Sequence, residues 1–175
     1  ADHRHLHSFP TRRSSDLAAM NEQIMHEMYS SYFYLSMSAW ADSENFSGFG
    51  NWLRMQAKEE LEHAMKFYDF LLDRGEKVTL MAIEQPPVKF NSLKEVFTMV
   101  YEHEQKVTAL INAIYAKALE GNDYASQTFL HWFIDEQVEE EKNSSELLAM
   151  VERAESNVDR KSTRLNSSHR IRSRM

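Results

Sequence analysis

Glu60 and His63 lie three residues apart in an acidic segment, and their types and spacing could do chemistry together. Side chains three positions apart on a helix lie on neighbouring parts of one face, about one turn apart. A carboxylate and an imidazole in this arrangement can bind the same metal ion. The pair alone is a weak indication of a metal site, because glutamate and histidine also occur at this spacing on solvated helix faces.

Two further carboxylates occupy positions that share a helix face with core residues. Glu27 is followed seven residues later by Tyr34, which projects from nearly the same face of a helix. Glu104 lies three residues from both Tyr101 and Val107, so it stands on the apolar stripe of its segment. Carboxylates at core-facing positions are costly unless a positive charge lies beside them. Their placement therefore predicts a bound cation.

The fourth segment of interest is the acidic run over residues 135–141, in which Gln137 and Glu140 face the same way. Such a run is usually a solvated helix face. The four segments together, with one carboxylate each and one histidine, supply oxygen and nitrogen ligands without sulfur. That ligand set suits iron or manganese and, less specifically, zinc. Two metal ions would need a bridging ligand, and Glu60 is the natural bridge because it stands between the other candidates.

Long helices must position these residues. The chain has only four glycines and three prolines among 175 residues, which favours long helices over short strands. Ser92 and Glu95 have the spacing of a capping box, in which each side chain satisfies a free amide at the start of a helix. Periodicity and these signals predict four helices, over about residues 17–45, 50–74, 92–120 and 122–156.

The segment over residues 76–90 is predicted to be an extended connection, because Pro86-Pro87 forbids a helix there. A connection of this length can run from one end of a bundle to the other, so the helices that it joins can be parallel. The predicted fold is therefore all-α: a ferritin-like four-helix bundle with one long crossover between its second and third helices.

Composition excludes several classes of site. The chain has no cysteine, so it has no disulfide, no iron–sulfur cluster and no thiolate zinc site, which fits a reducing cytoplasm. No apolar run approaches the roughly 20 residues that span a bilayer, and no signal peptide is visible. We therefore expect a cytoplasmic protein without a membrane partner. The net charge of −7 and the few basic residues in the central segment argue against nucleic-acid binding.

Both ends of the chain differ from the rest. Residues 1–16 and 160–175 are rich in Arg, Ser and His and lack apolar periodicity. They could be basic arms for nucleic acid, or they could be disordered or non-native tails, since their composition cannot bury a core. We favour the second interpretation, which leaves residues 17–159 as the folded domain.

Five segments resemble motifs of the bacterial non-haem ferritins, in the same order and with the same spacing. They are Asn21-Glu22-Gln23, Glu27-x-Tyr29-Ser30-Ser31-x-x-Tyr34, Glu59-Glu60-x-x-His63, Tyr101-x-His103-Glu104-Gln105 and Glu136-Gln137-x-Glu139-Glu140-Glu141. The resemblance extends over about residues 18–157. It implies an iron-storage ferroxidase, which oxidises Fe(II) with dioxygen and stores ferric mineral inside a hollow shell of 24 identical subunits.

The resemblance also implies a role for each site residue. The first of two iron ions per subunit would be held by Glu27, Glu60 and His63, with Glu60 bridging to the second. The second ion would be held by Glu104 and Glu140, with Gln137 close by. A possible third iron site would be formed by Glu59, Glu136 and Glu139, with Glu140 shared. Tyr34 would lie beside the pair as an electron donor.

The sequence departs from this family in one respect, and it differs from the bacterioferritins in two others. The short fifth helix that usually follows the bundle is replaced by the basic, Ser-rich tail, which affects the channel that this helix builds and hence shell assembly. The fourth helix carries Gln137-x-x-Glu140 where bacterioferritins have a second Glu-x-x-His. No methionine is a clear haem ligand, and Met55 and Met65 are interpreted as core residues. We therefore expect no haem.

Two other functions stay open at this point. A rubrerythrin-like di-iron peroxidase or oxygenase would need an electron-donor site, and the chain has no Cys-based module to supply one. A bundle without catalysis, acting as a scaffold, predicts that the acidic ligand candidates are exposed and far apart. We favour iron storage.

The remaining histidines and the tryptophans are not needed as ligands. We interpret His26, His103 and His131 as packing or surface residues, and Trp40, Trp52 and Trp132 as core or subunit-interface residues.

Overall fold

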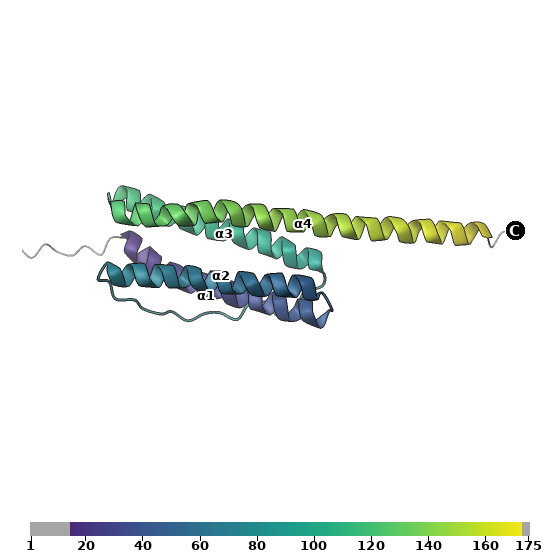
Figure 1. The fold of residues 1–175 in the computed structure, drawn as a ribbon, viewed down its shortest axis with the longest axis horizontal. Coiled ribbons are helices and arrows are strands. Elements are labelled where there is room, and N and C mark those ends of the chain that lie inside the picture. Colours follow the sequence, from purple (N-terminus) through teal and green to yellow (C-terminus); the bar gives the residue numbers. More distant parts are fainter. Residues whose placement is uncertain (1–14, 173–175) are drawn as a thin grey trace, which may run out of the picture.

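The computed structural model describes residues 15–172, with side chains up to residue 156, and these residues form four helices and no strand (Figure 1). Few helix breakers and long apolar stripes produce four long helices, as the sequence predicts. Their bounds are α1 Ser15–Ser43, α2 Ser47–Asp73, α3 Leu93–Glu120 and α4 Tyr124–Arg172. The all-α prediction is confirmed.

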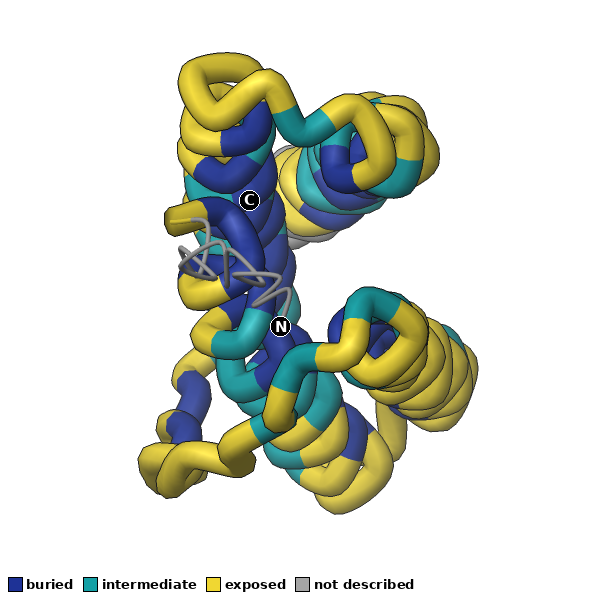
Figure 2. The backbone as a smooth tube through the Cα atoms, turned by 90° about the vertical axis from the view of Figure 1, so that its left-hand side faces the viewer, coloured by how far each residue is buried: buried dark blue, intermediate teal, exposed yellow. Residues whose placement is uncertain are grey.

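The helices form two hairpins that are joined by one long crossover. α1 packs against α2, α3 packs against α4, and α1 also contacts α3 between the hairpins (Figures 1 and 2). The crossover lies along α1 and is bonded to it near both ends. Asn21 exchanges two hydrogen bonds with the backbone of Thr79, at 3.0 and 2.8 Å, and Ser36 Oγ donates to the carbonyl of Pro87 at 2.6 Å. This connection makes α2 and α3 parallel.

Local signals define the helix ends. Gly75, just past α2, has a φ of +74°, which glycine adopts without steric cost. Ser92 Oγ accepts from the amide of Glu95 at 3.1 Å, as the capping box predicts. The reciprocal bond differs from the prediction, because the Glu95 carboxylate accepts from the amide of Asn91 at 2.6 Å, one residue before Ser92. The side chain thus closes the turn one residue earlier.

The apolar core is divided into two clusters along the bundle axis. One cluster includes Met20, Phe67 and Ile111, and the other includes Phe33 and Leu53. On α1, α2 and α3, buried polar side chains lie at positions between the two clusters, and α4 carries buried polar side chains beyond its members of the first cluster. The bundle therefore carries a polar layer in its middle, with apolar packing on both sides (Figure 2 shows the buried positions facing the interior).

Two predicted core residues are instead exposed. Met55 and Met65 have 46% and 40% of their surface accessible, so their interpretation as core packing is wrong, and Trp132 is 40% exposed. The physical reason is helical phase: Gln56 and Glu60 lie on the buried face of α2, and each neighbouring position is rotated by about 100°. The exposure of Trp132 agrees with its other interpretation, as a subunit-interface residue.

The fourth helix is longer than predicted. Its backbone continues to Arg172, whereas the apolar pattern predicts an end near Ser156. Residues 1–14 and 173–175 lie outside the described part of the chain, as do the side chains from residue 157 onward, so the interpretation of both tails stays a prediction. Within the described residues, no helix is long and apolar enough to cross a membrane.

Candidate metal centre

The polar layer contains every residue predicted for the two-metal centre. α1 contributes Glu27 and Tyr34, α2 contributes Glu60 and His63, α3 contributes Glu104, and α4 contributes Gln137 and Glu140. All seven side chains are buried, and Glu104 has no exposed surface at all. The scaffold hypothesis is therefore not favoured, because it predicts that these acids are exposed and far apart.

Three of these residues already converge as metal ligands would. Glu27, Glu60 and His63 each offer a ligand atom, and these atoms lie within 4.8 Å of one another. His63 Nδ1 is 3.6 Å from Glu60 Oε2. Glu27 Oε2 is buried and has no hydrogen-bond partner. A buried carboxylate oxygen without a donor is costly, and a cation in this position would remove the cost.

The remaining ligand candidates are engaged by neutral donors. Tyr34 donates its hydroxyl proton to Glu104, and Gln137 Nε2 lies 3.3 Å from Oε2 of the same carboxylate. Glu140 accepts from Gln56 Nε2 through both oxygens, at 3.2 and 3.0 Å. Carboxylates have about four lone-pair sites, so each keeps acceptor capacity for a cation.

The electrostatics of the layer also favour a cation. Burial, followed by the charge of Glu60, raises the pKa of Glu27 well above its usual value, and burial with the charge of Glu104 does the same to Glu60. Burial raises the pKa of Glu104 and of Glu140 to about 7. Like charges held together in a dry space have raised pKa values unless a positive charge joins them.

The residues predicted for a third site lie at the edge of this layer. Glu59 and Glu139 are exposed and Glu136 is partly buried. The pKa of Glu59 is raised, mainly by burial, and the charges of Glu136 and Glu139 add to the shift. These acids are thus electrostatic neighbours, but among the described residues only Glu27, Glu60 and His63 form a converged ligand group.

Sequence reasoning missed two buried glutamines. Gln23 Nε2 donates to Glu27 Oε1 at 3.0 Å, and Gln56 binds Glu140 as described above. Each glutamine precedes a predicted ligand of its own helix, Glu27 or Glu60, by four residues. A polar residue at this spacing shares the ligand's face, which is the signal that could have found them.

The other histidines take no part in the converged group. His103 is largely buried, its Nε2 lies 2.7 Å from Ser30 Oγ, and burial lowers its pKa to about 4. His131 is exposed and contacts Tyr115. Both agree with their interpretation as packing or surface residues.

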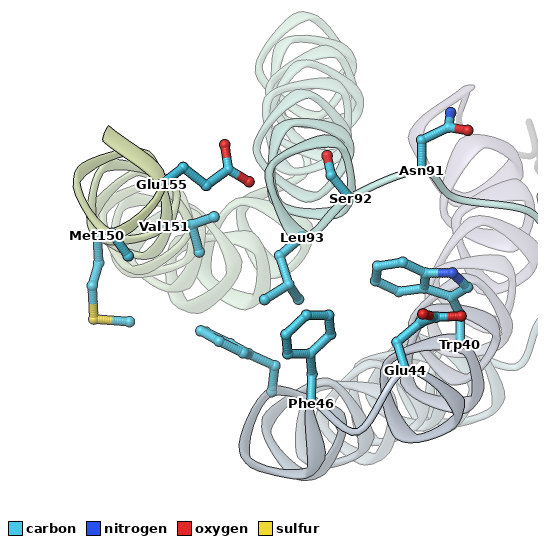
Figure 3. Close-up of a pocket in the computed structure, with 11 residues that line it drawn as sticks. Trp40, Glu44, Phe46, Asn91, Ser92, Leu93, Met150, Val151 and Glu155 are labelled. Carbon is cyan, nitrogen blue, oxygen red and sulfur yellow. The ribbon is translucent and has the colours of Figure 1, made fainter. Parts of the chain in front are cut away.

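An apolar cavity near one end of the bundle is separate from the centre. It has a volume of about 800 Å³ and lies between the turn after α1 and the facing parts of α3 and α4 (Figure 3). Trp40, Phe46, Leu93 and Val151 are among its lining residues, and none of the seven residues of the polar layer lines it. The candidate centre is a buried polar layer, and this cavity is not part of it.

A four-helix bundle with one long crossover and inward carboxylates on every helix is the architecture of the carboxylate-bridged di-metal proteins. The comparison with known families agrees: the family described as ferritin-like domain matches residues 17–154. The chain belongs to the ferritin family.

Individual relatives support this assignment. A probable bacterial non-heme ferritin-like protein of Haemophilus influenzae is 42% identical over 129 residues, which cover 74% of this chain and 78% of the relative. A bacterial non-heme ferritin of Staphylococcus epidermidis is 43% identical over 125 residues, 71% of this chain and 75% of the relative.

Solved structures give the same result. An open pore ferritin from the archaeon Archaeoglobus fulgidus matches with a TM-score of 0.76 and 44% identity, over 77% of this chain and 83% of that one. A humanized archaeal ferritin matches with a TM-score of 0.80 and 39% identity, over 82% and 88%. The sequence-based prediction of the family is confirmed.

Proposed function

We propose that this protein stores iron and acts as a ferroxidase, oxidising Fe(II) with dioxygen at the polar layer. The observation that carries the proposal is the convergence of Glu27, Glu60 and His63, with a Glu27 oxygen that has neither solvent nor a donor. Oxygen and nitrogen ligands without sulfur suit Fe(II), and anionic oxygen ligands favour Fe(III) still more. Oxidation is therefore downhill once the ion is bound.

Two iron ions as substrates explain the second half of the layer. The first ion would lie among Glu27, Glu60 and His63, and Glu60 would bridge to the second. Glu104 and Glu140 would hold the second ion, with Gln137 close by. Each Fe(II) loses one electron, so one dioxygen gains two electrons and takes up two protons to form hydrogen peroxide. Tyr34, which donates to Glu104, would lie beside the pair as an electron donor.

The ferric product would move to the mineral through the exposed acids. Glu59, Glu136 and Glu139 lie beside the layer and closer to solvent, so they can bind iron more weakly and release it. We propose that copies of this chain assemble into a shell of 24 subunits whose cavity holds the mineral. The chain's net charge of −7 would favour the entry of cations.

The test is aerobic addition of Fe(II) to metal-free protein, with ferric absorbance and oxygen uptake recorded together. We expect rapid oxidation in the parent and, in Glu60→Ala/His63→Ala, the rate of iron in buffer alone. The control is Glu62→Ala/His131→Ala, which removes an exposed glutamate of α2 and an exposed histidine of α4. Sustained uptake of many irons per chain would support storage, whereas parent and mutant oxidising iron alike would refute the proposal.

A further inference from the structure

Gln56 stands in an unusual position relative to the polar layer. Its side chain is 7% exposed, and its amide nitrogen donates to both oxygens of Glu140 on the opposite hairpin. Among the described residues, these two hydrogen bonds are the ones that join a residue inside α2 to a residue inside α4. The backbones of these two helices make few close approaches, so a long side chain must span the distance.

Glu140 needs such a partner more than the other ligand candidates do. The hydroxyl of Ser144 donates to the backbone carbonyl of Glu140 at 2.7 Å and not to its carboxylate. The carboxylate lies at the α2 and α4 side of the layer, near the exposed acids Glu59 and Glu139. A glutamate side chain has three rotatable bonds, so without a donor it could turn toward water. Gln56 fixes it inside the layer.

The hydrogen bond and metal binding are compatible. The amide occupies one lone pair on each carboxylate oxygen, and the remaining lone pairs stay available to a cation. Carboxylates that bind metals are usually hydrogen-bonded in turn, and removing such a partner typically lowers metal affinity by about 10- to 100-fold.

We propose that Gln56 is a positioning residue that orients Glu140 and thereby sets the affinity of the second metal position relative to the first. This inference rests on the proposed two-metal centre. The first position has its own counterpart, because Gln23 donates to Glu27 at 3.0 Å. Both glutamines are buried and each donates to one ligand candidate, Gln23 within its own helix and Gln56 across to α4, so each serves as the control for the other.

The experiment is an anaerobic titration of the metal-free full-length protein with Co(II), followed by visible absorption and calorimetry at constant pH. The parent should bind two Co(II) per chain. Gln56→Met keeps the side-chain length but removes the donor, and we expect it to weaken the second equivalent by about 10- to 100-fold while the first is unchanged. Gln23→Met should weaken the first equivalent instead.

Gln56→Asn tests the position of the donor, because it keeps the amide and moves it back by one methylene. The same selective loss of the second equivalent is expected. A second equivalent of unchanged affinity in Gln56→Met, or an equal loss at both positions, would overturn the positioning role. A parent that binds fewer than two Co(II) would instead overturn the two-metal centre of the proposed function.

Discussion

The buried carboxylates of the centre are stabilised by neutral donors. Gln23 donates to Glu27, Tyr34 to Glu104 and Gln56 to Glu140, and none of the described lysine or arginine side chains is buried. Neutral donors orient a carboxylate without cancelling its charge. The negative charge of the layer is therefore left for a cation to balance, which is what a site for divalent metals requires.

At this scale the stability of the metal-free protein should depend on pH. Burial raises the folded-state pKa of Glu104 and Glu140 to about 7. A carboxyl with a raised folded-state pKa stabilises the fold fully below its unfolded pKa, and this contribution is lost as the pH rises through about 7. We expect the free energy of unfolding, measured in urea, to fall between pH 6 and pH 8 by the order of 1 kcal/mol for each group.

The control for this pH dependence is Glu104→Gln/Glu140→Gln, which cannot ionise at these positions. Its stability should change much less between pH 6 and pH 8. A parent whose stability rises over this interval would contradict the assignment of raised pKa values to the two glutamates.

Tyr34→Phe should shift the pH at which the second metal binds. The Tyr34 hydroxyl lowers the pKa of Glu104 by donating to its charged form, against the larger effect of burial. Removing the donor should raise the midpoint of Co(II) binding at the second position by up to about one pH unit. Tyr29→Phe is the control, because Tyr29 stacks on Phe33 and is not among the described donors to the carboxylates of the centre. Identical pH profiles for both variants would refute this role.

At the scale of helices, the sequence predicts which helices exist and their order better than it predicts which face of each helix is buried. Pro86-Pro87 defines the crossover, Ser92 caps α3, and Gly75 follows α2, because each of these signals is local. The buried face of α2 could not be predicted in the same way. Met55 is more hydrophobic than Gln56, yet Gln56 is buried, since its amide has a partner on another helix. Tertiary hydrogen bonds of this kind are invisible to a local pattern.

The junction between the hairpins offers a test at this scale. Asp123 Oδ1 accepts from the amide of Ser126 at the start of α4, and both Asp123 oxygens accept from Arg74 at the end of α2, at 3.0 and 2.7 Å. Asp123→Ala removes the cap and the partly buried ion pair, and it should destabilise the protein by about 1–2 kcal/mol. Thermal or urea unfolding would measure this loss.

Asp42→Ala is the comparison for that measurement. Asp42 forms a more exposed pair with Arg54, at 2.7 Å, and it caps no helix. Exposed ion pairs contribute between about 0 and 1 kcal/mol, so the effect should be smaller. Equal losses in the two variants would show that the cap at α4 adds nothing.

At the scale of the molecule, α1 and the crossover expose several large apolar side chains. The crossover is bonded along α1, and the exposed large apolar side chains of both segments therefore lie on neighbouring elements. They are Tyr32, Leu35, Leu80, Met81, Ile83 and Val88. Large exposed apolar patches are typical of contacts between protein chains, so we expect this face to lie between subunits of the proposed shell.

Leu35→Glu should disrupt that contact. Leu35 is 45% exposed on α1, and burying a charge without a partner in an apolar interface is strongly unfavourable. We expect light scattering after size exclusion to show smaller assemblies, with fast iron oxidation retained and sustained mineral growth lost. Leu35→Met keeps the face apolar and should assemble like the parent. A normal shell in Leu35→Glu would place the contact elsewhere.

The polar layer has a further consequence for how metal enters. Burial raises the pKa of the glutamates in the layer, so between its two apolar clusters the empty layer holds protons to a higher pH than exposed glutamates would. A divalent ion can enter only by displacing those protons. Metal loading is thus an ion exchange, in which each cation that binds displaces protons that are released to the solvent.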